Sequence, residues 1–261
     1  MAYSFRLIAW HAVAPRLHTL ADWQQWAEHP ESLADLPERA PDLTHIPALQ
    51  RRRLAPAARL MTAALQPLTA YGPAPLIYIS HDGEINRSFA LWDELIRADT
   101  VSPLSFGLSV HNALPGQYSI LHDDTSEQTA LCAREACLET AVIEACATLA
   151  DGAPRVRIAV VENPPDAAHP LAGSAPFPFA LALLIAPGDS HRLHRNTTDD
   201  LYQSQKADWQ GGAPMQPDNS LELASRESKY WTALDWIRAE IRHDAAQTVT
   251  CQSVCWQWER L

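Results

Sequence analysis

Residues 129–163 read TALCAREACLETAVIEACATLADGAPRVRIAVVEN, and this stretch decides the fold class. It opens with the short segment TALCA at 129–133, and Asp151-Gly152 supplies the stop of a helix that follows. Four apolar side chains fall on one face of that helix: Leu138, Val142, Ala145 and Leu149. Residues 156–163 then form a continuous apolar run, which is typical of a central strand covered on both faces. Strands that alternate with helices predict an α/β protein.

The alternation extends to the segments around this stretch. Apolar runs at 5–14, 75–81 and 179–187 predict buried strands, and the run at 75–81 is rich in β-branched and aromatic residues. Residues 51–68 and 88–97 repeat their apolar side chains at helical spacing. The chain therefore has enough elements for a sheet with helices packed on it.

The pattern weakens beyond Gly188, where we expect a polar segment, a helix near 220–239 and one final strand at the C-terminal end. Aromatic side chains gather in this last quarter of the chain. Five of them are tryptophans: Trp209, Trp231, Trp236, Trp256 and Trp258. Such residues either complete a core or anchor an interface, and composition does not separate the two roles.

The composition argues against several classes of function. The 261 residues carry a formal net charge of −11, and the longest basic run is Arg51–Arg53, so we expect no binding to nucleic acid. No apolar run reaches the roughly 20 residues that a membrane span requires. Because the 20 prolines outnumber the 9 glycines, we expect no glycine-rich phosphate loop and no cofactor. The five cysteines cannot all pair, and the first residues do not resemble a secretion signal, which predicts reduced thiols in the cytoplasm.

Cys137 is the sharpest candidate for a nucleophile. It lies at the expected start of a helix, where the helix dipole lowers a thiol pKa and free amides can hold an oxyanion. A free cysteine is also among the residues most often buried for packing alone. His111, followed by Asn112, is a possible base, although a structural role is the more common one for such a histidine. Glu135, near the same helix start, has a plain use in the first turn, where a carboxylate complements the dipole.

Two further pairs have spacings that metal sites use. His191 and His194 are three residues apart, which would place them together on a helix. Cys251 and Cys255 fit one face of the terminal strand. Neither pair has further ligands at a recognised spacing, so no metal site is expected.

Read together, three segments resemble the N-terminal half of a β-ketoacyl synthase. They are LIAWHAVAP at 7–15, PLSFGLSVHNALPGQYSIL at 103–121, and the helix of 129–152 with the strand VRIAVVENPP that follows it. The likeness is greatest to the short, chain-length-factor-like proteins found beside aryl polyene and related pigment synthases. It implies a thiolase-like half with one mixed β-sheet covered by helices. We therefore expect a single domain over residues 1–261, with its core at about 5–187 and a C-terminal extension at 188–261.

The resemblance also bears on the nucleophile. Counting back from Ile143-Glu144-Ala145, the family's catalytic cysteine position falls on Glu135, which implies a degenerate site. A register two residues further along would place it on Cys137 instead. Full-length synthases also supply two histidines and a lysine from a second half, and the two imidazoles stabilise the enolate that forms during condensation. We therefore expect no condensation by this chain alone.

The function implied is that of a non-catalytic, chain-length-factor-like subunit. Such a chain pairs with a full-length β-ketoacyl synthase as a heterodimer in polyene or fatty-acyl biosynthesis, and meets the acyl carrier protein indirectly. The alternative from the residues themselves is a cysteine-dependent acyltransferase or thioesterase-like enzyme that uses Cys137 with His111 as its base. A third reading is a self-associating protein that binds acyl chains without chemistry.

Overall fold

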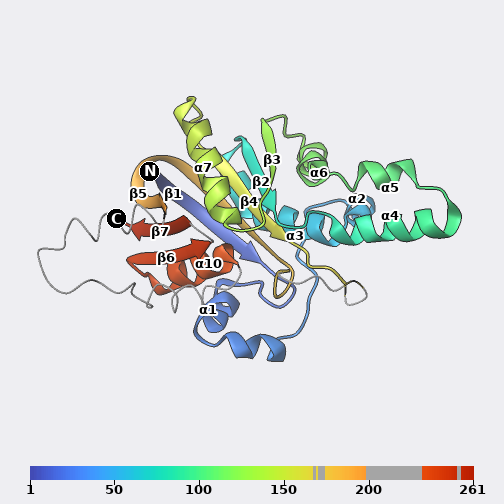
Figure 1. Cartoon of the computed structure of the whole chain (residues 1–261), viewed down its shortest axis with the longest axis horizontal. Coiled ribbons are helices and arrows are strands. Elements are labelled where there is room, and N and C mark those ends of the chain that lie inside the picture. Colours follow the sequence, from blue (N-terminus) through green and yellow to red (C-terminus); the bar gives the residue numbers. More distant parts are fainter. Residues whose placement is uncertain (167–168, 170–173, 198–230, 252–253) are drawn as a thin grey trace, which may run out of the picture.

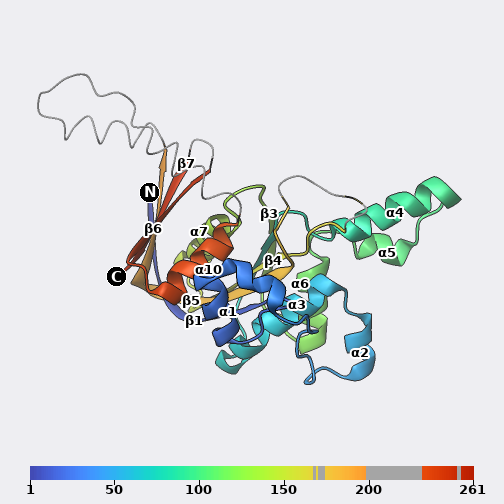
Figure 2. The same ribbon diagram turned by 90° about the horizontal axis from the view of Figure 1, so that it is seen from below.

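The computed structural model describes residues 1–166, 169, 174–197, 231–251 and 254–261. Within these ranges the chain forms one seven-stranded mixed sheet with helices on both of its faces (Figures 1 and 2). The strands are β1 (Ala2–Val13), β2 (Leu76–Ser80), β3 (Gln128–Cys132), β4 (Val156–Glu162), β5 (Phe179–Thr197), β6 (Ala246–Cys251) and β7 (Val254–Arg260). The predicted α/β class with one mixed sheet is confirmed.

The sheet is built around β5. Its order is β3-β2-β4-β5-β7-β6, and β1 pairs with the other edge of β5. The strands β3, β2 and β4 are parallel, whereas β5 is antiparallel to β4, β1 and β7. The carboxyl ends of these three parallel strands therefore lie side by side, and the candidate site lies there.

The helices are α1 (Leu20–Glu28), α2 (Ala48–Arg53), α3 (Pro56–Leu65), α4 (Ile85–Ala98), α5 (Pro103–Gly107), α6 (Ala113–His122), α7 (Cys137–Ala150) and α10 (Thr232–Arg242), with 3-10 turns η1 (Pro30–Asp35) and η2 (Gln66–Tyr71). Alternate residues of each strand point to opposite faces. In β2, Ile77 and Ile79 belong to the core under α7, whereas Leu76 and Tyr78 belong to the core under α3. No helix in the described part of the chain has the length and apolar composition to cross a bilayer.

One strand extends further than its sequence pattern indicates. The expected end near Gly188 is wrong, because β5 continues to Thr197 and its second half pairs with both β1 and β7. The register with β1 jumps from Ala186 to His191, so Pro187-Gly188 lies in a bulge and does not end the strand. Gly188 has a φ of +154°, and a Cβ there would meet the Cβ of Arg6 at 2.7 Å, which explains the glycine.

Other boundaries differ for local reasons. The single helix expected over 51–68 is two helices, because α2 ends at Arg53 and α3 begins at Pro56, whose ring favours the first helical position. The final strand is a hairpin of β6 and β7. Of the helix expected near 220–239, residues 220–230 lie outside the described residues, and α10 begins at Thr232.

The C-terminal tryptophans complete a core. Four of them are at most 7% exposed: Trp231, Trp236, Trp256 and Trp258. They pack with the buried Trp23 and Trp26 of α1 in the core on the α7 side of the sheet. Trp236 of α10 lies edge-on to Trp10 of β1, with ring centroids 5.8 Å apart. The interface role therefore does not apply to these four, and Trp209 lies outside the described residues.

Two helices stand apart from the sheet. Figures 1 and 2 both show α4 and α5 projecting away from the body of the molecule. Among the helices and strands, α4 packs mainly on α5, and Leu91 is its one buried residue. We call residues 85–110, which include both helices, the arm.

Candidate functional site

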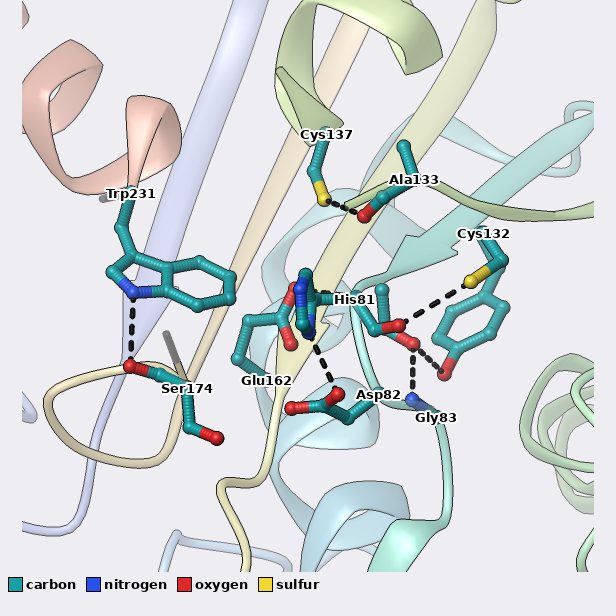
Figure 3. A network of polar contacts seen from close by, with 11 residues as sticks. His81, Asp82, Gly83, Cys132, Ala133, Cys137, Glu162, Ser174 and Trp231 are labelled. Carbon is teal, nitrogen blue, oxygen red and sulfur yellow. Dashed lines mark hydrogen bonds and ion pairs between the residues drawn. The ribbon is translucent and has the colours of Figure 1, made fainter. Parts of the chain in front are cut away.

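The candidate site lies where β2, β3 and β4 end beside the start of α7. Ser80 of β2 pairs with Cys132 of β3, and Glu162 is the last residue of the parallel neighbour β4. Open α/β sheets place their functional groups outside the carboxyl ends of such strands. Figure 3 shows the polar contacts that these strand ends and the start of α7 make with one another.

The turn into α7 has an unusual backbone. Ala136, the residue before the helix, has φ 52° and ψ 43°, a left-handed conformation that costs an alanine about 1–2 kcal/mol. Strain of this kind in a residue other than glycine often marks a functional turn. Ala136 is only 8% exposed, and its methyl group offers no nucleophile.

The expected positions on either side of Ala136 differ in exposure. Glu135 is exposed and precedes the helix, so its placement in the first turn is wrong; the first-turn acid is Glu139. Cys137 is the first helical residue and is 5% exposed. The left-handed backbone at Ala136 turns the chain sharply between these two positions, so that Glu135 before it is exposed and Cys137 after it is buried.

The Cys137 thiol is held in its protonated form. Its Sγ donates a hydrogen bond to the carbonyl oxygen of Ala133 at 3.1 Å (Figure 3). Burial raises the pKa of this thiol far above its ordinary value, and the nearby carboxyl groups of Glu162 and Glu139 raise it further. A nucleophilic cysteine needs the opposite shift, because the thiolate is the reactive form.

His111 does not lie against Cys137 in any contact of the described residues. Its Nε2 is hydrogen-bonded to the carbonyl oxygen of Leu131, and its ring packs on Tyr78 with centroids 5.1 Å apart. Burial lowers the pKa of His111 below its ordinary value. These contacts hold the loop before α6 against β2 and β3, so His111 has a structural role.

The structure brings together three titratable residues that the sequence patterns did not single out. The backbone N–H of His81 donates to Oε1 of Glu162 at 2.9 Å, and Nδ1 of His81 lies 2.7 Å from Oδ1 of Asp82 (Figure 3). Glu162 is 2% exposed, and its burial, together with the charge of Asp82, raises the pKa of its carboxyl group well above the ordinary value. Their position in the sequence could have identified them, because His81 and Asp82 directly follow the apolar strand β2 and Glu162 ends the apolar strand β4.

Neighbouring groups close this cluster on two sides. The Cys132 thiol donates to the carbonyl oxygen of His81 at 3.3 Å. The Trp231 indole lies edge-on to the His81 ring with centroids 5.6 Å apart, and its Nε1 donates to the carbonyl oxygen of Ser174 at 3.3 Å (Figure 3). Hydrogen bonds thus join the ends of β2, β3 and β4 and the α7 turn, and the Trp231 ring brings the start of α10 against the same cluster.

A second buried acid joins α7 to the C-terminal hairpin. Glu139 is fully buried, and its Oε1 accepts a hydrogen bond from Nε1 of Trp258 at 2.9 Å. Burial raises the pKa of this carboxyl group, and hydrogen bonds from Thr232 and Trp258 oppose the shift. The first turn of α7 is thereby tied to both α10 and β7.

The two pairs with metal-like spacing are separated by the fold. His191 and His194 lie on β5, not on a helix, and each has its own acid: Glu240 at 3.2 Å and Glu259 at 3.2 Å. Cys251 and Cys255 lie on different strands of the β6–β7 hairpin, and Cys255 pairs with Thr250, the residue before Cys251, so the expected single strand and single face are both wrong. Within the described ranges, no group of three or more His, Cys, Asp or Glu side chains is arranged to hold a metal ion.

A family model described as the N-terminal domain of β-ketoacyl synthase matches residues 23–259. The chain belongs to this family. The resemblance seen in the sequence is therefore confirmed, and it extends beyond residue 187 to the C-terminal hairpin. No curated protein matches this synthase-like chain.

Solved structures share the synthase-family fold over the whole chain. The ketosynthase (ApeO) in complex with its chain length factor (ApeC) from Xenorhabdus doucetiae contains a chain that matches with a TM-score of 0.78 and 20% identity, covering 98% of this chain and 99% of that one. The ishigamide ketosynthase/chain length factor matches at 0.67 with 12% identity and 99% coverage of both. A type II polyketide synthase acyl carrier protein in complex with its ketosynthase, bound to the hexaketide, matches at 0.62 with 11% identity over the full length of both chains.

Proposed function

We propose that this chain is a non-catalytic, chain-length-factor-like subunit that pairs with a full-length β-ketoacyl-ACP synthase. The observation that carries the proposal is the turn into α7: it keeps a strained left-handed backbone but presents Ala136, while the adjacent Cys137 is a buried thiol. A family member whose helix start holds no reactive thiolate needs a partner to supply the nucleophile.

The structural matches support a paired subunit. A chain of nearly the same length in a ketosynthase and chain length factor complex aligns with 98% of this one. In the pair, the catalytic cysteine belongs to the synthase, and this chain closes one end of the acyl tunnel and limits product length. Acyl carrier protein is then recruited by the synthase, since the −11 net charge of this chain repels an acidic carrier.

Two further observations support the proposed cellular compartment and domain organisation. All five cysteines are free, which supports a reducing compartment such as the cytoplasm. The expected C-terminal extension contributes β6 and β7 to the common sheet, which supports a single domain over residues 1–261. The pair acts in the synthesis of polyene or fatty-acyl chains.

The test is co-expression with the ketosynthase encoded nearest to this chain, followed by size-exclusion chromatography with mass determination and a condensation assay. We expect a stable one-to-one complex whose activity survives Cys137→Ala and is lost when the synthase cysteine is replaced. Separate elution of the two proteins, with turnover of an acyl thioester by this chain alone, would contradict the proposal.

The alternative enzyme is tested by thiol labelling of this chain alone. Cys132 is exposed and Cys137 is buried, so a maleimide at pH 7.5 should modify Cys132 first. Fast, selective labelling of Cys137 in a Cys132→Ser variant would favour the acyltransferase with Cys137 as nucleophile.

A further inference from the structure

The start of α7 has backbone N–H groups that the helix itself does not pair. The first four N–H groups of a helix have no partner within it, and here they belong to residues 136–139. Groups of this kind can hold the oxygen of an acyl group while negative charge develops on it. An acyl thioester that reached this turn would therefore need one of these N–H groups for its carbonyl oxygen.

Groups of the chain itself already occupy two of the four. The N–H of Ala136 is hydrogen-bonded to Sγ of Cys251, on β6. The N–H of Glu139 is hydrogen-bonded to its own carboxyl group, which also accepts from Nε1 of Trp258, on β7, at 2.9 Å. Both strands of the C-terminal hairpin thus contact the start of α7.

The hairpin holds Cys251 in this position. Cys251 pairs with Val254 on β7, and its half-buried side chain packs against the core that contains Ala136. A thiol sulfur is a weak acceptor, but it takes up the space beside the N–H that a carbonyl oxygen would need. The hairpin would have to shift before such an oxygen could bind there.

Cys251 is not itself a suitable nucleophile. Burial raises the pKa of its thiol to about 12, and the carboxyl groups of Glu139 and Glu135 raise it further. The thiol is therefore neutral at physiological pH, whereas the thiolate is the reactive form. The contact of Cys251 with α7 prevents chemistry at this turn and does not supply it.

We propose that Cys251 fills the position in which an acyl carbonyl oxygen would bind at the α7 turn. The C-terminal hairpin then blocks this site whichever residue stands at the nucleophile position, so a restored thiol alone does not restore acyl transfer. This inference rests on the proposed function, in which the turn is inert and the synthase subunit supplies the reactive cysteine.

The experiment introduces a nucleophile at the turn and then removes the block. All variants carry Cys132→Ser, which removes the exposed thiol. Ala136→Cys adds a thiol at the left-handed residue, and Ala136→Cys/Cys251→Ala also frees the N–H. The matched control is Ala136→Cys/Cys255→Ala, because Cys255 lies on the same hairpin and its thiol is hydrogen-bonded to Thr250. Circular dichroism first confirms that the variants are folded.

The rate measured is acylation by p-nitrophenyl acetate at pH 7.5. The new thiol loses its proton to the buffer, the thiolate attacks the ester carbonyl carbon, and p-nitrophenolate leaves as the thioester forms. Peptide mass spectrometry locates the acetyl group at position 136. Because one oxyanion donor contributes a factor of about 10²–10³ in rate, we expect Cys251→Ala to accelerate acylation at least tenfold and the control to change it by less than about twofold.

A second measurement does not depend on the new thiol. With Ala136 retained, its amide hydrogen should exchange at least tenfold faster in Cys251→Ala than in Cys255→Ala, as followed by NMR, because only the first change removes the acceptor. If Cys251→Ala leaves either the acylation rate or the exchange rate unchanged, the proposed block is overturned.

These results are separate from the test of subunit pairing. If Cys251→Ala accelerates neither process while the chain still forms its one-to-one complex, the block is wrong and the proposed function stands. If the original chain alone turns over an acyl thioester at this turn, the proposed function fails, and the block fails with it because the site is then open.

Discussion

Glu162 shows how far a single residue departs from its usual chemistry at this strand end. A carboxyl group on a strand terminus normally carries a charge, yet this one is 2% exposed and accepts a backbone N–H from His81. Because its pKa is raised in the folded chain, folding favours the protonated form. Its contribution to stability is therefore complete below its ordinary pKa of 4.5 and is lost as the pH rises toward the folded pKa.

Replacing this acid with its neutral isostere should remove that loss. In Glu162→Gln, the amide oxygen can still accept from His81, and no charge forms at high pH. We expect the variant to match the original chain at pH 4.5 and to exceed its unfolding free energy by about 1 kcal/mol or more at pH 8. Urea unfolding at both values measures this. Exposed Glu28→Gln is the control, and an equal gain there would contradict the explanation.

Sequence reasoning found parts of this site and missed others. It placed Cys137 at a helix start, because helix signals are local. It did not bring His81 to Glu162, since these residues are far apart in the chain and meet only through the pairing of β2 with β4. Burial of the Cys137 thiol likewise depends on which elements pack over the α7 turn, and no local pattern carries that information.

At the scale of elements, apolar runs identified β1, β2, β4 and the first half of β5, because buried β-strands have a strong local signature. The second half of β5 was not predicted, because Pro187-Gly188 resembles the end of a strand. This half belongs to the sheet through its pairing with β1 and β7, which a local pattern does not reveal. The C-terminal hairpin depends on similar distant support: Trp258 of β7 donates to the buried Glu139 of α7.

Removing that donor should loosen the hairpin from α7. Trp258→Phe retains an aromatic ring but leaves a buried carboxyl oxygen without its indole donor. We expect the unfolding free energy to fall by about 1–3 kcal/mol, measured by urea denaturation. The matched change Trp92→Phe, at an exposed tryptophan, should alter it by less than about 0.5 kcal/mol. Equal effects of the two changes would show that the Glu139 bond contributes nothing.

At the scale of the whole molecule, a large negative charge and an exposed apolar arm act against each other. The charge keeps copies of the chain apart in neutral solution, and the exposed apolar side chains of the arm, Trp92 and Ile96 among them, favour association once the charge is reduced. The isoelectric point of about 5.4 sets the pH at which the repulsion vanishes.

Self-association should therefore depend on pH through the arm. Sedimentation velocity should show a monomer at pH 8 and larger species near pH 5.5, because net repulsion is lost there. The Trp92→Ser/Ile96→Ser variant should associate much less at pH 5.5. Association of that variant to the same extent would mean that another surface is responsible.

The central strand has a consequence for synthesis on the ribosome. β5 pairs with β1, near residue 1, and with β7, which ends at residue 260. Until β7 emerges, the second half of β5 presents an open edge, and such nascent edges recruit chaperones or aggregate. The sheet therefore closes late, so shortening the chain by its last few residues should hinder recovery of folded protein from cells far more than their small share of the core suggests.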